Sequence, residues 1–178
     1  MHGRGGQGAV TSAELLARAA IAEGRYAQAF PSFGPERRGA PVQAFVRISD
    51  QPIRIRAEVT EPDIVMVLDP GLLHIVKVTA GLKKGGVMVA NTRDYEAIPA
   101  EIRSAWRVAS IDANTIAREV LGVPIVNTTM LGALIKASGA IKMESIEIPL
   151  KDRFGKLAEK NLKAMTRAFE ETVVKEPA

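Results

Sequence analysis

The sequence predicts an α/β domain in which a mixed, mostly parallel β-sheet lies between helical layers, as a three-layer sandwich. Continuous apolar runs at residues 64–68 and 87–90 are typical of central strands that are covered on both faces. Segments of helical character alternate with such strands along the chain, and this alternation favours an α/β fold. We therefore expect one Rossmann-like domain that spans residues 1–178.

Helices are predicted where good helix formers run up to a glycine, because glycine is a common residue just beyond a helix end. Gly24, Gly122 and Gly139 are such stops. Asp112 and Asn114 offer capping side chains at the start of one of these helices. The predicted helices cover residues 9–23, 72–78, 115–121, 130–138 and 157–174. The last of them is amphipathic, with apolar residues at near-helical spacing.

The predicted strands cover residues 26–30, 42–48, 53–56, 64–68, 87–90 and 106–111. Residues 42–48 alternate in part between apolar and polar side chains, residues 53–56 alternate fully, and residues 49–52 between them form a turn. This pattern predicts a β-hairpin with one face buried, which makes the sheet mixed. Residues 31–41 are dense in proline, glycine and charge, so we interpret them as a loop.

The composition excludes several classes of protein. The chain has 178 residues with a net charge of +4, which is too small and dispersed to indicate a nucleic-acid partner. It has no cysteine, so its own thiolates cannot form disulfides, act as nucleophiles or hold an iron–sulfur cluster. No apolar run approaches the roughly 20 residues that span a bilayer, and the first residues have no apolar signal region. We therefore expect a cytoplasmic protein without a membrane partner.

The N-terminal stretch Gly3-Arg4-Gly5-Gly6-Gln7-Gly8 is the strongest local motif. A glycine loop that leads into a helix offers unpaired backbone N–H groups at the positive end of the helix dipole, which suits an anion. Arg4 adds a permanent charge. The spacing also fits a dinucleotide-binding fingerprint, but the preceding strand is missing or cut short, and no acidic residue follows at about 20 positions to hold a ribose. A P-loop is excluded because no Gly-Lys-Ser/Thr follows.

A second loop, Gly34-Pro35-Glu36-Arg37-Arg38-Gly39, also carries arginines between glycines. Loops at the carboxyl ends of parallel strands gather at one edge of a sheet, so we expect Arg37 and Arg38 to lie near Arg4. Three guanidinium groups there would suit a phosphate-bearing ligand or an acidic partner surface. A plain solvated loop is the alternative interpretation of the same residues.

The remaining polar residues indicate no catalytic centre. His2 and His74 are the only histidines and lie far apart in the sequence, so we expect no metal site. Asp63 and Asp69 bracket a predicted strand and are interpreted as turn formers. Asn91 and Asn127 stand where strands end or helices begin and are interpreted as caps. No nucleophile, base and orienting group can be assembled, so the chain does not look like a complete enzyme.

Several motifs together resemble the gamma subunit of pyruvate (or 2-oxoacid):ferredoxin oxidoreductase. They are His2-Gly-Arg-Gly-Gly-Gln-Gly-Ala-Val-Thr11, Tyr26-Ala-Gln-Ala-Phe-Pro31, Phe33-Gly34, Glu36-Arg-Arg-Gly-Ala-Pro41, Glu61-Pro-Asp63, Leu68-Asp69-Pro70, Lys84-Gly-Gly86, Asn91-Thr92 and Asn127-Thr128. The resemblance covers essentially the whole chain. It departs from the family in one respect. Members usually have a short strand ahead of the glycine loop, whereas this chain starts almost on the loop.

The resemblance implies a complex that converts pyruvate or a related 2-oxoacid, coenzyme A and oxidised ferredoxin to acyl-CoA, CO2 and reduced ferredoxin. It implies that thiamine diphosphate and the 4Fe-4S clusters belong to partner subunits (alpha, beta and delta), and that this chain alone binds no cofactor and is inactive when isolated. The gamma chain is similar to the domain that packs beside the thiamine-binding subunits and helps to form the approach of coenzyme A.

We hypothesise that the two glycine-flanked loops form this interface or the edge that faces coenzyme A. The candidate residues are Gly3, Arg4, Gly5, Gly6, Gln7, Gly8, Thr11, Glu36, Arg37, Arg38 and Gly39. A free-standing nucleotide or coenzyme A binding module is the alternative. The sequence does not identify the 2-oxoacid, because the substrate-pocket residues would lie on other chains. We expect pyruvate to be the substrate, and branched-chain 2-oxoacids, 2-oxoglutarate and aryl 2-oxoacids are the alternatives.

Overall fold

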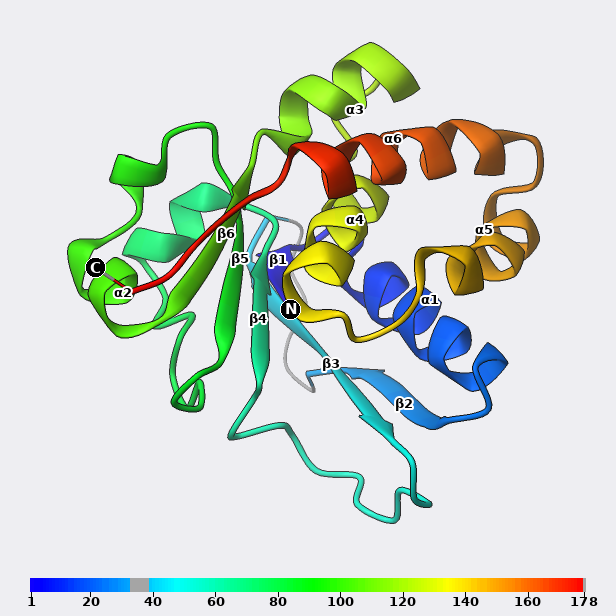
Figure 1. Cartoon of the computed structure of the whole chain (residues 1–178), viewed down its shortest axis with the longest axis horizontal. Helices are drawn as coiled ribbons and strands as arrows, with labels where there is room; N and C mark the ends of the chain where they lie inside the picture. The colour runs from blue at the N-terminus through cyan, green and yellow to red at the C-terminus, as the bar shows by residue number, and fades with distance from the viewer. Residues whose placement is uncertain (33–38, 178) are drawn as a thin grey trace.

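The computed structural model describes residues 1–32 and 39–177. The predicted site residues Glu36, Arg37 and Arg38 therefore lie outside the described residues. Within the described part, the strands form one sheet in the order β2-β3-β1-β4-β5-β6-β7 (Figure 1). The strands are β1 His2–Arg4, β2 Tyr26–Pro31, β3 Pro41–Ser49, β4 Ile64–Val67, β5 Val87–Asn91, β6 Arg107–Ile111 and β7 Val173–Lys175.

The sheet is mixed, with a parallel centre. Strands β1, β4, β5 and β6 run parallel to one another. Strand β3 is antiparallel to β1, β2 is antiparallel to β3, and β7 is antiparallel to β6. The predicted mixed, mostly parallel sheet is confirmed. In this sheet the glycine loop leaves the carboxyl end of the central strand β1, and the turn after β4 lies beside it.

Helices cover both faces of the sheet, which confirms the three layers. They are α1 Ala9–Ala22, α2 Ala100–Ala105, α3 Ala113–Leu121, α4 Asn127–Ser138, α5 Glu147–Phe154 and α6 Ala158–Glu171. The larger core joins one face to α1, α3, α4 and α6. The smaller core joins the other face to α2 and the 3-10 helix Pro70–His74 (Figure 1). No helix among residues 1–32 and 39–177 combines the length and the apolar character needed to cross a bilayer.

The continuous apolar sequence of β4 follows from this arrangement. Successive side chains of a strand point to opposite faces of the sheet. Val65 and Val67 accordingly pack in the smaller core, while Met66 and the following Leu68 pack in the larger one. All four side chains are at most 3% exposed. An apolar residue is required at every position because both faces are covered.

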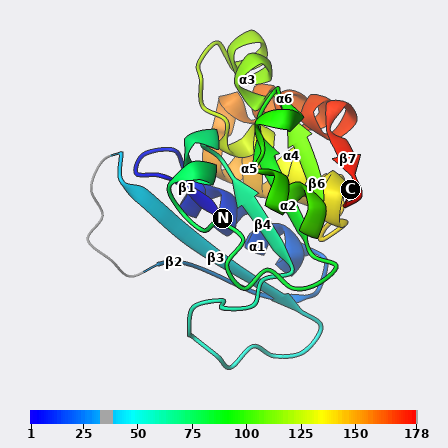
Figure 2. The same cartoon turned by 90° about the vertical axis from the view of Figure 1, so that its left-hand side faces the viewer.

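The predicted hairpin between residues 42–48 and 53–56 is wrong in its second strand. The hairpin instead joins β2 to β3, which pair from Tyr26 opposite Ser49 to Pro31 opposite Ala44 (Figure 2). Strand β2 therefore pairs with β3 on the side away from β1, where residues 53–56 were expected. Residues 53–56 have no regular structure. Ile55 is 63% exposed. Alternation alone indicated extended backbone and could not identify the partner strand.

The C-terminal third also differs from prediction. The single helix expected over residues 157–174 is divided into α6 and the edge strand β7, which pairs with β6 (Figure 2). Val173 and Val174 are β-branched and favour a strand.

Three other helical segments also differ from prediction. Helices α2 and α5 were not predicted, and the helix expected over residues 72–78 is a 3-10 helix that ends at His74.

Candidate functional site

The glycine loop begins with a tight turn. Gly3 and Arg4 belong to β1 rather than to the loop, and the backbone N–H of Gln7 donates to the carbonyl of Arg4 at 2.9 Å. Gly6 stands at the third position of this turn with φ of +94°. A type II β-turn requires a positive φ at that position, which is why glycine is favoured there. The turn directs the chain from the sheet into α1.

Gly8 is the N-cap of α1 and allows a close approach between two helices. Its φ is +81°, and a Cβ at this position would lie 2.6 Å from Nδ2 of Asn127, at the start of α4. Gly8 has no side chain with which to cap α1, and the first turn of the helix has no acidic residue. The first backbone N–H groups of the helix have no intrahelical acceptor and lie at the positive end of its dipole, and the anion site expected here stays a prediction.

Arg4, Gln7 and Asp69 form a closed ring of polar contacts. Arg4 Nε lies 2.8 Å from Asp69 Oδ2 as an ion pair, and Gln7 Nε2 donates to the same oxygen at 3.4 Å. The backbone N–H of Arg4 donates to Gln7 Oε1 at 2.7 Å. The charge of Arg4, expected to be free for an anion, is thus balanced by a carboxylate.

The second predicted loop reaches the first one at its C-terminal end. The backbone N–H of Gly39 donates to the carbonyl of Gly5 at 3.3 Å, and that of Gly5 donates to the carbonyl of Ala40 at 2.9 Å. Arg4 Nη1 also donates to the carbonyl of Gly39 at 3.2 Å. The glycine loop and residues 39–40 therefore lie side by side.

Beside the glycine loop is a cavity of about 210 Å³ at the carboxyl edge of the sheet. This is the edge at which open α/β sheets bind their ligands. Its wall combines backbone and polar side chains with the apolar loop that precedes α4. The lining residues are Gly6, Gln7, Leu68, Asp69, Pro70, Asn91, Asn114, Pro124, Ile125 and Val126. Of the predicted site residues that the structure describes, Gly6 and Gln7 alone line it.

Asn91 fixes one wall of this cavity. Its amide nitrogen donates to the carbonyl of Leu68 at 2.9 Å, and its amide oxygen accepts the backbone N–H of Ala113 at 3.1 Å. The side chain thereby joins the ends of β4 and β5 to the start of α3. The residue is 1% exposed, so both contacts are shielded from water. The interpretation of Asn91 as a cap describes only the second contact.

Thr11 lies apart from this cavity. Its hydroxyl accepts a hydrogen bond from Arg153 of α5 at 3.4 Å. His2, by contrast, lies in the sheet, and burial lowers its pKa to about 4. The imidazole is therefore neutral at physiological pH. Within residues 1–32 and 39–177, no group of three His, Cys, Asp or Glu side chains is placed to hold a metal ion.

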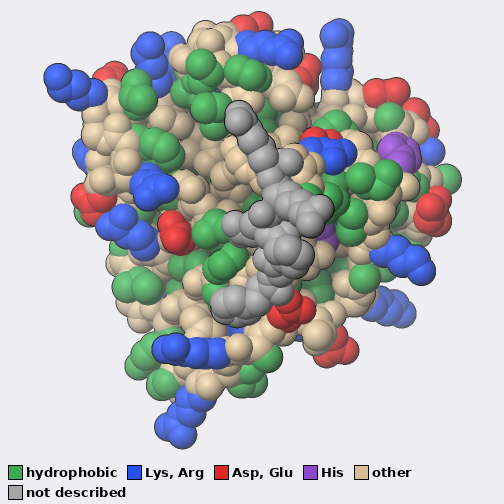
Figure 3. All heavy atoms as spheres, turned by 180° about the vertical axis from the view of Figure 1, so that it is seen from behind, with side chains coloured by type: hydrophobic (Ala, Val, Ile, Leu, Met, Phe, Trp, Pro, Cys, Tyr) green, Lys and Arg blue, Asp and Glu red, His purple; other side chains and the backbone are tan. Residues whose placement is uncertain are grey.

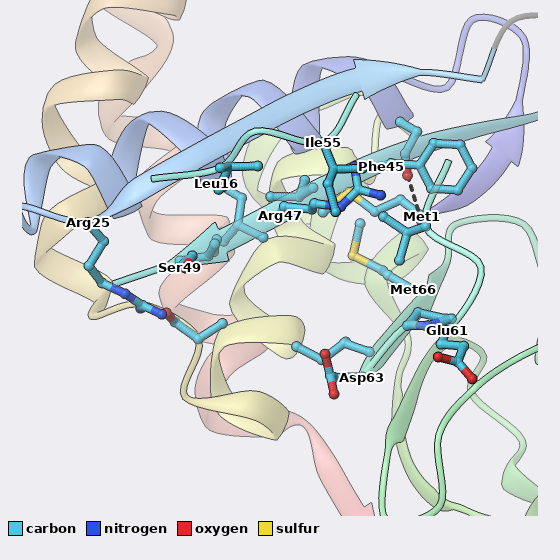
Figure 4. Close-up of a pocket in the computed structure, with 18 of the residues that line it drawn as sticks. Met1, Leu16, Arg25, Phe45, Arg47, Ser49, Ile55, Glu61, Asp63 and Met66 are labelled. Carbon is cyan, nitrogen blue, oxygen red and sulfur yellow. Dashed lines mark hydrogen bonds between the residues drawn. The ribbon is translucent and has the colours of Figure 1, made fainter. Parts of the chain in front are cut away.

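A larger cleft of about 580 Å³ lies at the opposite, amino edge of the sheet (Figure 4). It opens between β3 and β4, where β1 no longer separates them. From the segment between these strands it is lined by Pro52, Ile53, Arg54, Ile55, Val59 and Glu61. Met1, Phe45 and Met66 contribute apolar surface, while Arg47 and Glu61 bring charge. No sequence motif predicts this cleft, because its residues come from segments without a common local pattern.

The face opposite to the view of Figure 1 carries basic and acidic side chains that are interspersed rather than gathered (Figure 3). This agrees with the dispersed charge expected from the composition. The structure thus defines an open α/β protein with an uncapped glycine-loop helix at its carboxyl edge.

Comparison with known proteins identifies the family. The model of the pyruvate ferredoxin/flavodoxin oxidoreductase family matches residues 1–171. The "Pyruvate/ketoisovalerate oxidoreductases common subunit gamma" of Thermococcus litoralis is 57% identical, over 98% of this chain and 96% of that protein. The "Pyruvate synthase subunit PorC" of Methanocaldococcus jannaschii is 50% identical, over 98% and 96%.

Comparison with solved structures supports the same family. The pyruvate oxidoreductase subunit PORC of Thermotoga maritima has a TM-score of 0.87 at 36% identity, over 98% of this chain and 96% of that one. A 2-oxoglutarate:ferredoxin oxidoreductase of Magnetococcus marinus shares the fold alone, with a TM-score of 0.71 at 23% identity over 96% of this chain and 29% of that one. The chain belongs to the pyruvate ferredoxin/flavodoxin oxidoreductase family. Within it, this is a gamma subunit of a 2-oxoacid:ferredoxin oxidoreductase, an enzyme whose activity belongs to the complex.

Proposed function

We propose that the chain contributes the carboxyl edge of its sheet to the approach of coenzyme A and to contact with partner subunits. The reaction of the complex is the conversion of pyruvate or a related 2-oxoacid, coenzyme A and oxidised ferredoxin to acyl-CoA, CO2 and reduced ferredoxin. The observation that supports this role is the polar cavity lined by Gly6 and Gln7, in the glycine loop that leads into α1. Helix starts and glycine loops favour phosphate groups, which coenzyme A carries.

The cavity is small for a complete binding site. Ligand pockets usually enclose about 300 Å³ or more, whereas this one encloses about 210 Å³. Coenzyme A would therefore contact the gamma chain with part of its length, and partner subunits would supply the rest of the site. A shared site of this kind favours the subunit interpretation over a free-standing coenzyme A or nucleotide binding module.

The partners in this proposal are the alpha, beta and delta subunits, with ferredoxin as the electron acceptor of the complex in the cytoplasm. Thiamine diphosphate and the 4Fe-4S clusters belong to those partners. The residues of this chain do not fit a cluster, since the sequence has no cysteine to ligate one. The acidic ligands that would hold a divalent ion are also not clustered within the described residues. Pyruvate is the first substrate to test, with branched-chain 2-oxoacids next.

A single added charge in the cavity, measured in the reconstituted complex, tests whether coenzyme A binds there. Asn114 lines the cavity in the first turn of α3. Asn114→Asp adds a negative charge there, and acidic residues in a first turn stabilise a helix. Repulsion of about 1 kcal/mol from the phosphates of coenzyme A would raise its KM roughly fivefold. We expect kcat and the KM for the 2-oxoacid to stay unchanged.

Ala100→Asp is the matched control. It adds the same charge to the first turn of α2, at an exposed position outside the residues that line the cavity. An unchanged KM for coenzyme A in Asn114→Asp, or an equal rise in both variants, would contradict the proposed site. Calorimetry of the purified chain with coenzyme A addresses the alternative, because tight binding without partners would favour a free-standing module.

A further inference from the structure

The carboxylate of Asp69 connects three parts of the carboxyl edge. Its Oδ2 accepts from Arg4 Nε at 2.8 Å and from Gln7 Nε2 at 3.4 Å, while its Oδ1 accepts the backbone N–H of Gly71 at 2.8 Å. The Asp69 side chain is 20% exposed, so solvent screens these contacts only in part. Asp69 thus ties β1 and the glycine loop to the turn that follows β4.

These contacts determine how the Arg4 guanidinium is presented. Nε binds Asp69, and Nη1 binds the carbonyl of Gly39 at 3.2 Å. Nη2 lies beside Gly71, where an added Cβ would stand 3.4 Å from Nη2 and 3.0 Å from Asp69 Oδ1. The planar guanidinium is therefore held on two sides, and the small residue at position 71 leaves room for it.

We propose that Asp69 is a positioning residue for the coenzyme A-dependent step, acting through Arg4 and Gln7. This inference rests on the proposed function of the cavity beside the glycine loop, which Arg4 does not itself line but adjoins through its contacts with Gln7 and Asp69. Gln7 and Asp69 both line that cavity. A long, flexible arginine side chain that is held before the ligand arrives loses less freedom on binding, which improves affinity. Asp69 itself would not contact the reacting atoms.

Three variants of the reconstituted complex separate positioning from charge. Asp69→Ala removes every contact and should raise the KM for coenzyme A about tenfold, with kcat within about twofold. Asp69→Asn keeps an oxygen acceptor and should raise the KM for coenzyme A about threefold, a smaller rise than in Asp69→Ala. Gly71→Ala leaves all charges in place but crowds Asp69 Oδ1, and should also raise the KM for coenzyme A.

The control lies at the other end of the same strand. Asp63 pairs with Lys83 Nζ at 2.8 Å, the same distance as in the Asp69–Arg4 pair, but at the amino edge of β4. Asp63→Asn should leave the KM for coenzyme A unchanged. The KM for the 2-oxoacid and the thermal midpoint of the complex are measured for all variants. A purely structural role would lower the midpoint without changing the KM for coenzyme A specifically.

The outcomes are distinct. If the Asp69 variants lower only the thermal midpoint, or if Asp69→Asn lowers the KM for coenzyme A, the positioning role is wrong. If Asn114→Asp raises that KM but the Asp69 variants do not, the proposed function stands and only the positioning role is refuted. If Asn114→Asp leaves the KM for coenzyme A unchanged, the proposed function is wrong and the positioning role falls with it.

Discussion

Gly132 in the middle of α4 provides the sharpest test of the packing. A Cβ at this position would lie 2.0 Å from the carbonyl oxygen of Met165 in α6 and 2.9 Å from the carbonyl carbon. Ordinary carbon–oxygen contacts are about 3.3 Å, so Gly132→Ala must separate the helices by roughly 1.3 Å. Met130, Leu131 and Met165, all 0% exposed, would lose contact as a result.

Two effects of this change oppose each other. Alanine favours a helix interior over glycine by about 1 kcal/mol. Overpacking typically costs about 1–3 kcal/mol and occasionally more, and an approach of 2.0 Å to helix backbone belongs at the high end, at about 4 kcal/mol. We expect Gly132→Ala to lower the free energy of unfolding by about 3 kcal/mol net, measured by urea denaturation of the purified chain. The control Gly24→Ala meets no atom within 4 Å but has φ of +80°, and should cost about 1 kcal/mol. A neutral or stabilising Gly132→Ala would refute the close packing of α4 on α6.

Two further predictions concern buried polar groups. Because burial lowers the His2 pKa from 6.5 to about 4, the unfolded chain binds more protons between these values, and stability is lost as the pH falls through this window. His2→Gln should reduce the difference in unfolding free energy between pH 7 and pH 4.5 by about 2 kcal/mol, and an unchanged difference would contradict the shift. Thr128 donates its hydroxyl to Asn161 Oδ1 at 2.6 Å in a buried contact, so Asn161→Ala should cost about 2 kcal/mol. Adding Thr128→Val should recover part of that loss, whereas additive losses in the double variant would indicate that the two groups are not coupled.

The central part of the fold could be predicted because its information is local. Buried strands such as β4 and β5 have apolar residues on both faces, and α1, α3 and α4 are each followed by a glycine. The hairpin partner of β3 could not be predicted, since residues 26–30 and 53–56 both have the character of extended backbone. The strand β7 was missed for a related reason. Its three residues continue an amphipathic pattern and become a strand only because the edge of β6 is available.

The site was predictable only in the parts that are contiguous in sequence. The glycine loop is visible as a motif because its turn and its helix start are built from consecutive residues. Asp69 was correctly interpreted as a turn former, since it caps the 3-10 helix by accepting from Gly71. Its ion pair with Arg4 spans 65 positions of sequence and could not be found from spacing. Asp63 has the same local signature but lies at the other edge of the sheet, so only the fold separates the two carboxylates.

The Asp69–Arg4 pair also changes how an anion would be recognised at this edge. An unpaired arginine would attract phosphate by its full charge, and binding would weaken strongly with added salt. With Asp69 beside it, the local charge of the described residues is close to balanced. The backbone N–H groups of Arg4, Gly5 and Gln7 already donate within the chain, so those of Gly6 and of the start of α1 become the main attraction. Such donors act at hydrogen-bond distance and select by geometry rather than by charge at a distance. Recognition would then depend on the shape of the loop, which is set by Gly6, by Gly8 and by the carboxylate of Asp69.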